Sequence, residues 1–242
     1  MKEIELTSEG QKIKGVVFQP QTLKDKNPAI LFVHGWTSSI KSNVQSAEAL
    51  TQLGHICICV DLRGHGESEG DIQKMTREDF LKDVLAVYDY LVAMNSVDKD
   101  DISAVGSSFG SYMVALLSSK RKIKNLALRV PANYPNDSFN EPQILFSGNN
   151  DPSILQWRFQ EMNKDSTYSL EAVNNFSGNV LIVESGQDEL IPHQTIENYM
   201  NAVQDKAKLT HIVMKDASHS ISRDQKSQLE YKQILINWFK NK

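Results

Sequence analysis

Short apolar segments alternate with amphipathic segments along most of the chain. Runs of valine, isoleucine and leucine without a polar break, such as residues 56–60, predict parallel strands that are covered on both faces. The predicted strands are residues 13–18, 29–33, 56–60, 102–105, 126–130, 180–183 and 209–214.

Apolar residues recur at helical spacing between these strands. In the clearest case, residues 80–91, Thr76 and Asp79 precede the helix as a variant capping box. Further helices are predicted over residues 42–53, followed by Gly54, over 192–203, opened by Pro192, and at the C-terminus, where residues 229–239 carry an apolar stripe. This alternation predicts an α/β fold with a mostly parallel central sheet and helices on both faces.

Residues 131–178 interrupt the alternation. They contain several prolines and no strand-like run, yet their aromatic residues are too numerous for a disordered linker. We therefore expect a small cap (lid) insertion with short helices, packed over one end of the sheet. Residues 1–130 and 179–242 would then form the α/β core. The alternative is that residues 131–178 form an irregular surface loop.

Composition narrows the class of protein. A length of 242 residues fits one domain with an insertion, and 26 Lys+Arg against 30 Asp+Glu argue against a nucleic-acid binder. The N-terminus lacks an apolar signal segment and no apolar run reaches membrane-spanning length, so a cytoplasmic protein without a membrane span is expected. Cys57 and Cys59 lie two apart on one predicted strand and are expected to be free and buried.

The strongest chemical signal is the pentapeptide Gly-Ser-Ser-Phe-Gly at residues 106–110. It lies between a predicted strand and an apolar helix, which is the context of a nucleophile elbow. Gly106 and Gly110 leave room in the tight turn, and the helix N-terminus favours a developing anion at Ser108. Ser108 is the candidate nucleophile, because the neighbouring Ser107 does not lie midway between the glycines.

A serine nucleophile needs a base, and the base needs an acid that orients it. Both are expected in loops after later strands, where Asp188 and then His219 occur. The order Ser108, Asp188, His219 matches a catalytic triad. Two other acids compete with Asp188, and three other histidines are interpreted as structural or solvated: Glu184, Glu189, His55, His193 and His211.

Backbone amides that stabilise an oxyanion are expected beside the nucleophile and after an earlier strand. Phe109 supplies the first amide by its position. The second is assigned to Trp36, because Gly35 in the same loop lets the backbone approach a substrate closely. His34 is expected to hold this loop by hydrogen bonds.

A set of motifs now resembles the α/β-hydrolase superfamily: His34-Gly35-Trp36, Asp61-Leu-Arg63-Gly-His65-Gly, Gly106-Ser-Ser108-Phe-Gly110, Gly186-Gln-Asp188 and Ala217-Ser-His219. Within that superfamily, the motifs most resemble those of serine-aminopeptidase-like and dienelactone-hydrolase-like proteins and of cinnamoyl (feruloyl) esterases. The resemblance covers about residues 12–242, with the cap as the exception. The resemblance implies an α/β-hydrolase fold. It also implies a structural turn after the fourth strand for Asp61, Arg63 and His65, in which an Asp–Arg pair can act as a brace.

These residues predict a serine hydrolase, carboxylesterase-like, that cleaves a small to medium ester through an acyl-enzyme. A peptidase, amidase or thioesterase on the same triad is the alternative, as is a non-catalytic ligand-binding protein of this fold. A serine at the elbow excludes dehalogenases and epoxide hydrolases, which use a carboxylate nucleophile.

No metal or organic cofactor is expected, and the expected partner is a small-molecule ester rather than nucleic acid. A monomer or homodimer is expected. The candidates for substrate contact in the cap are Tyr134, Asp137, Gln143 and Tyr168, for which folding of the cap itself is the plainer role.

Overall fold

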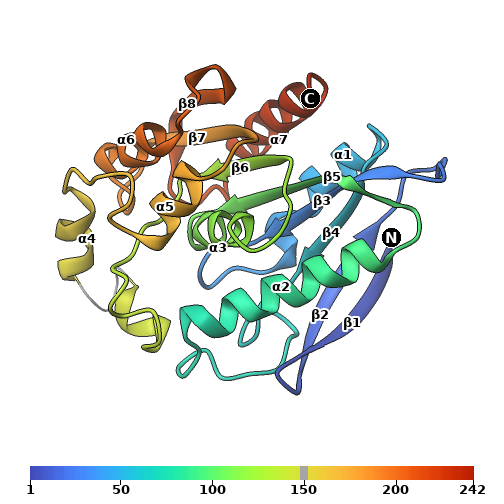
Figure 1. The fold of residues 1–242 in the computed structure, drawn as a ribbon, viewed down its shortest axis with the longest axis horizontal. Helices are drawn as coiled ribbons and strands as arrows, with labels where there is room; N and C mark the ends of the chain where they lie inside the picture. The colour runs from blue at the N-terminus through green and yellow to red at the C-terminus, as the bar shows by residue number, and fades with distance from the viewer. Residues whose placement is uncertain (148–151) are drawn as a thin grey trace.

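The computed structural model describes residues 1–147 and 152–242, which form an eight-stranded sheet with helices on both sides (Figure 1). The strand order is β1-β2-β4-β3-β5-β6-β7-β8. In this order, each strand from β4 onwards pairs with the next one in parallel. The pairs β1–β2 and β2–β4 are antiparallel. The strands are β1 (Lys2–Ser8), β2 (Gln11–Phe18), β3 (Asn27–Val33), β4 (Ile56–Val60), β5 (Val97–Ser107), β6 (Asn125–Arg129), β7 (Asn179–Gln187) and β8 (Leu209–Ser218).

Two apolar layers, one on each face of the sheet, fix the positions of the helices. One layer packs beneath α2 (Arg77–Ala93), α3 (Phe109–Ser118), α5 (Tyr168–Asn174) and α6 (His193–Ala202). The other packs beneath α1 (Val44–Thr51) and α7 (Gln225–Phe239). This arrangement confirms the predicted α/β-hydrolase class. No helix in the described part of the chain is long and apolar enough to cross a membrane.

Every predicted strand is present, and one further strand was not predicted. β1 alternates charged and apolar residues and lies at the edge of the sheet, so it lacks the continuous apolar run of a central strand. The capping box before α2 is confirmed. The Thr76 hydroxyl accepts from the Asp79 amide at 3.2 Å, while the Asp79 carboxylate accepts from the Thr76 amide at 3.0 Å.

The predicted cap region contains short helices in its described part. These are the 3-10 helix η2 (Gln143–Phe146), α4 (Pro152–Arg158) and α5. Residues 148–151 lie outside the described residues. α4 lies at the periphery of the fold, whereas α5 packs against α3 and α6 (Figure 1). The boundary of the cap at residues 131 and 178 remains a prediction.

Arg77 of α2 anchors the start of this region. Its buried guanidinium donates to the Pro135 carbonyl at 3.0 Å and to the Ser138 hydroxyl. It also lies 5.0 Å from the Tyr134 ring centroid and 5.2 Å from that of Phe146. Cation–π contacts and hydrogen bonds to neutral oxygens therefore join α2 to the segment after β6.

The loop after β4 is a structural turn, as the resemblance implied. The Asp61 carboxylate accepts from the Ile40 amide at 2.7 Å and from the Glu67 amide at 3.1 Å. Arg63 does form an Asp–Arg pair, but its partner is the buried Asp83 of α2. The brace therefore links the turn to a helix, which could not be foreseen because Asp83 is twenty residues away in sequence.

The two cysteines are free and buried on β4, which confirms the sequence interpretation. Burial raises the pKa of the Cys57 thiol to about 12. Because the thiolate is the reactive form, both side chains behave as small apolar residues in the layer beneath α1 and α7.

Candidate active site

Ser108 occupies a strained turn between β5 and α3. Its backbone has φ 53° and ψ −114°, a conformation that is costly for a residue with a side chain. A Cβ atom on Gly110 would lie 2.2 Å from the Val33 carbonyl oxygen, and one on Gly106 would lie 2.4 Å from the Gly110 carbonyl carbon. Both glycines are therefore required for the sharp turn that exposes a nucleophile.

Asp188 and His219 lie in contact, although 31 residues separate them in sequence. His219 Nδ1 lies 2.9 Å from Asp188 Oδ2 and 3.0 Å from Oδ1. The same carboxylate accepts from the amides of Leu190 at 2.9 Å and Ile191 at 2.8 Å. These bonds fix the carboxylate as an acceptor, so we assign the imidazole proton to Nδ1. His219 Nε2 then has its lone pair free, without a partner among the described residues.

Ser108 and His219 line one cavity of about 790 Å³ at the carboxyl ends of the strands. No hydrogen bond joins the Ser108 hydroxyl to the His219 ring among the described contacts. Such bonds are often long in unliganded enzymes and tighten when substrate binds. The structure thus joins the candidate acid and the candidate base directly, and the candidate nucleophile lines the same cavity as the base.

The loop after β3 is held by a neutral histidine. His34 Nε2 accepts from the Leu62 amide at 3.1 Å, and Nδ1 donates to the Gly35 carbonyl at 2.8 Å. Burial, followed by the nearby His65, lowers the pKa of His34 to about 3, so the ring is neutral at ordinary pH. The expectation that His34 holds this loop is confirmed.

The two candidate oxyanion donors lie beside the elbow. A Cβ atom on Gly35 would lie 3.2 Å from the Ser107 carbonyl oxygen, so the loop after β3 runs against the nucleophile turn. Neither the Trp36 amide nor the Phe109 amide donates to a protein acceptor within residues 1–147 and 152–242. Trp36 lines the cavity, whereas Phe109 is itself buried and directly follows Ser108, which lines it.

Arg129 at the end of β6 is a contributor that the sequence interpretation missed. Its guanidinium donates to the hydroxyls of Ser107 at 3.0 Å and Ser185 at 3.1 Å. It also donates to the carbonyls of Ser218 at 3.2 Å and His219 at 2.8 Å. Arg129 thus ties the elbow, β7 and the His219 loop together. The available sequence signal was a cation within the predicted strand 126–130, whose other residues are apolar.

The competing acid Glu184 has other partners. Its carboxylate lies 2.7 Å from His193 Nδ1 and 3.0 Å from His211 Nε2. The hydrogen bond to Glu184 raises the pKa of His193. None of these three side chains lines the cavity that holds Ser108. Glu189, the second competitor, accepts weakly from the His219 amide at 3.4 Å.

The cap candidates divide between two environments. Tyr134 is buried and lines the cavity. Asp137, Gln143 and Tyr168 are not among its lining residues. Arg158 of α4, which the sequence interpretation did not single out, does line it.

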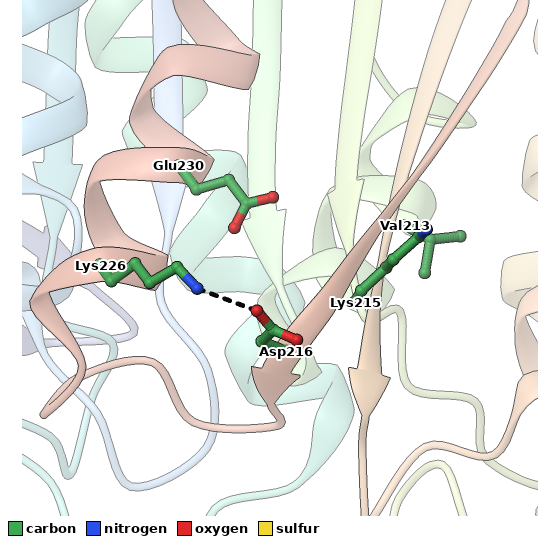
Figure 2. A pocket seen from close by; sticks show the side chains of 5 residues that line it. All are labelled: Val213, Lys215, Asp216, Lys226 and Glu230. Atoms are coloured by element: carbon green, nitrogen blue, oxygen red, sulfur yellow. Dashed lines mark hydrogen bonds and ion pairs between the residues drawn. The ribbon is translucent and has the colours of Figure 1, made fainter.

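A second hollow, of about 560 Å³, lies between β8 and α7 and is shown in Figure 2. Lys226 and Asp216 form an ion pair across it at 2.9 Å. Its remaining lining residues, Val213, Lys215 and Glu230, add no nucleophile or imidazole. This surface hollow is therefore not a candidate active site. Within the described residues, no cluster of His, Cys, Asp and Glu is suited to a metal ion.

Known proteins that resemble this chain include esterases and thioesterases. The mitochondrial palmitoyl-protein thioesterase ABHD10 of Homo sapiens is 35% identical over 108 residues, which span 44% of this chain but only 33% of that protein. A carboxylesterase of Bacillus subtilis is 21% identical over 241 residues, covering 92% of this chain and 96% of that enzyme.

Solved structures share the fold over nearly the whole chain. Est1E from Butyrivibrio proteoclasticus, solved with ferulic acid bound, has a TM-score of 0.74 at 20% identity and covers 98% of both chains. Mouse alpha/beta hydrolase domain-containing protein 10 has a TM-score of 0.70 at 17% identity, covering 100% of this chain and 99% of that one. The sequence profile of the prolyl oligopeptidase family matches residues 40–242. The chain therefore belongs to the prolyl oligopeptidase family and has the α/β-hydrolase fold.

Proposed function

We propose that the protein is a serine hydrolase that cleaves carboxylic esters through an acyl-enzyme. The observation that carries the proposal is the Asp188–His219 pair, whose free imidazole nitrogen shares a cavity with Ser108 on its strained turn. A non-catalytic protein has no evident reason to keep the strain at Ser108, which costs of the order of 1–3 kcal/mol.

In the proposed reaction, Ser108 Oγ attacks the ester carbonyl while His219 Nε2 accepts its proton. Asp188 holds the imidazole in the required tautomer and stabilises the imidazolium. The amides of Trp36 and Phe109 donate to the oxyanion. His219 then protonates the leaving alcohol, and water, deprotonated by the same imidazole, releases the acid and restores Ser108.

The lining of the cavity favours an ester over a peptide with a free amino terminus. Among the described residues, neither aspartate nor glutamate lines the cavity, so a substrate ammonium would find no carboxylate there. Thioester hydrolysis on the same residues is the second candidate, because the ABHD10 proteins are thioesterases by name. A matched pair of 4-nitrophenyl butyrate and S-phenyl thiobutyrate distinguishes these two substrate classes by kcat/KM.

The test of the proposal is Ser108→Ala. We expect the variant to hydrolyse 4-nitrophenyl butyrate about 10⁴-fold more slowly or worse, since loss of one triad member removes the whole unit. Its melting temperature should stay close to that of the wild type. Retained hydrolysis in a clean preparation contradicts the role of Ser108. A folded wild-type protein that turns over neither ester nor thioester favours the ligand-binding alternative.

A further inference from the structure

The candidate active-site cavity is lined by positive charge. Its lysine and arginine lining consists of Lys41, Arg129 and Arg158 among the described residues, and neither aspartate nor glutamate accompanies them. The chain as a whole has a net charge of −4, so the positive lining is not a consequence of composition. Fixed cations in a concave site without carboxylates raise the local concentration of anionic ligands.

Two of the three cations are poorly suited to bind a substrate group directly. The Arg129 guanidinium already donates to the elbow, to β7 and to the His219 loop. Lys41 is exposed to solvent, where water and salt weaken its interactions. Arg158 is as deeply buried as Arg129, unlike Lys41, but within the described residues it makes only two of the hydrogen bonds open to a guanidinium, whereas Arg129 makes four.

Arg158 is a buried cation that lines the cavity with only 4% of its surface exposed. Nη1 donates to the Leu190 carbonyl at 3.2 Å, and Nε makes a long contact to the Asn133 carbonyl at 3.5 Å. Its guanidinium carbon lies 5.2 Å from the Tyr134 ring centroid. These partners are all neutral, and Nη2 donates to no acceptor within residues 1–147 and 152–242. A buried cation without an anionic partner is costly, and that cost falls when an anion binds.

We propose that Arg158 binds a negatively charged oxyacid group, a carboxylate or a phosphate, carried by the ester substrate. This inference rests on the proposed function and names its substrate class as an ester with an anionic acyl or alcohol part. A guanidinium presents parallel N–H groups that match two oxygens of such an anion. Arg158 is then the residue that selects charged esters over neutral ones.

Matched substrates test the proposal. One pair places the charge in the acyl part, 4-nitrophenyl hemiglutarate against 4-nitrophenyl pentanoate. The other places it in the alcohol part, 4-carboxyphenyl butyrate against 4-carbamoylphenyl butyrate. In at least one pair we expect the wild-type kcat/KM to favour the anionic ester about tenfold or more. Equal or better turnover of the neutral ester in both pairs overturns the proposal, without reference to any variant.

Substitutions then locate the selectivity. Arg158→Met should lower the anionic-to-neutral ratio at least about tenfold, whereas Arg158→Lys, which keeps the charge but loses the paired N–H groups, should lower it by a smaller factor. Arg121→Met is the matched control, because Arg121 is paired with Asp89 at the surface and does not line the cavity. An unchanged ratio in folded Arg158→Met, or an equal fall in Arg121→Met, contradicts the assignment.

Binding to Ser108→Ala separates this proposal from the proposed function. Benzoate and phenyl phosphate, titrated calorimetrically, identify which oxyacid the site takes, and uncharged benzamide is the control. Tighter binding of either anion than of benzamide supports the anion site, even if no ester is ever hydrolysed. Equal binding of all three compounds contradicts it. Absence of turnover with preserved anion binding would instead count against the proposed function alone.

Discussion

Two carboxylate–imidazole contacts lie four residues apart at the end of β7, and they differ in their surroundings. Asp188 contacts one histidine, His219, whose second ring nitrogen has no partner in the described part of the chain and which lines the cavity with Ser108. Glu184 contacts two histidines, His193 and His211, none of them in that cavity. A hydrogen bond between a carboxylate and a histidine is therefore no sufficient mark of a catalytic pair. What distinguishes the proposed catalytic pair is an imidazole nitrogen without a described partner, in a cavity that the strained Ser108 also lines.

Substituting the histidines should separate the two clusters most strongly. We expect His219→Gln to lower kcat for 4-nitrophenyl butyrate by about 10⁴-fold or more, because the base is lost. His211→Gln removes the same ring from the Glu184 cluster and should change kcat less than about threefold. Comparable losses in the two variants would show that the clusters do not differ in function.

Substituting the two acids, Asp188 and Glu184, should separate the two clusters in the same way, with a smaller loss of kcat. Asp188→Asn keeps the side-chain shape but favours the wrong imidazole tautomer, so kcat should fall about 10³-fold or more. Glu184→Gln, the matched isosteric change, should leave kcat within about threefold. Steady-state kinetics on both purified variants give the comparison, and a larger loss in Glu184→Gln would reverse the assignment of the acid.

Arg129 should contribute to stability and to the placement of His219. Arg129→Met removes the donor to the buried Ser185 hydroxyl and to three part-buried oxygens, at up to about 1–3 kcal/mol each, so we expect the free energy of unfolding to fall by about 2–4 kcal/mol. We also expect kcat to fall about tenfold through misplacement of His219, with partial recovery in Arg129→Lys. Urea unfolding and kinetics measure the two effects separately. Equal destabilisation by the surface control Arg121→Met, expected at under about 1 kcal/mol, would contradict this role.

The Glu184 cluster should show a small pH dependence of stability. Glu184 raises the pKa of His193 in the folded protein. The stabilisation is therefore complete below the unfolded value of about 6.5 and is lost as pH rises through the folded pKa. Glu184→Gln should destabilise the protein more at pH 6 than at pH 9, by less than about 1 kcal/mol, since the His193 side chain is 60% exposed. A larger effect at pH 9 would contradict the sign.

The sequence predicted what depends on local pattern. Strand β4 matches its prediction at both ends, because Ile56–Val60 is apolar throughout and Gly54 ends the segment before it. Ser108, Asp188 and His219 could be named as candidates because each follows a predicted strand, and in the structure each comes directly after the end of a strand. The edge strand β1 was missed because it shows alternation rather than a continuous apolar run.

Partners that are distant in sequence could not be predicted in the same way. The pairing of Arg63 with Asp83, the four acceptors of Arg129 and the position of Arg158 in the cavity all depend on tertiary packing. Likewise, the partners of the competing acid Glu184 depend on the register of β7 and β8. That register places Glu184 beside Val213, within reach of His211, and leaves Asp188 for the following loop.

A fluorophosphonate probe tests most directly whether Ser108 is the activated nucleophile. The wild-type protein is incubated with the probe, digested, and mapped by mass spectrometry, with His219→Gln and His211→Gln treated in parallel. The proposed role of Ser108 predicts one adduct at this residue, formed at a similar rate in His211→Gln and at least about a thousandfold more slowly in His219→Gln. An adduct on Ser107 or another serine, or an unmodified Ser108 in folded protein, would contradict it.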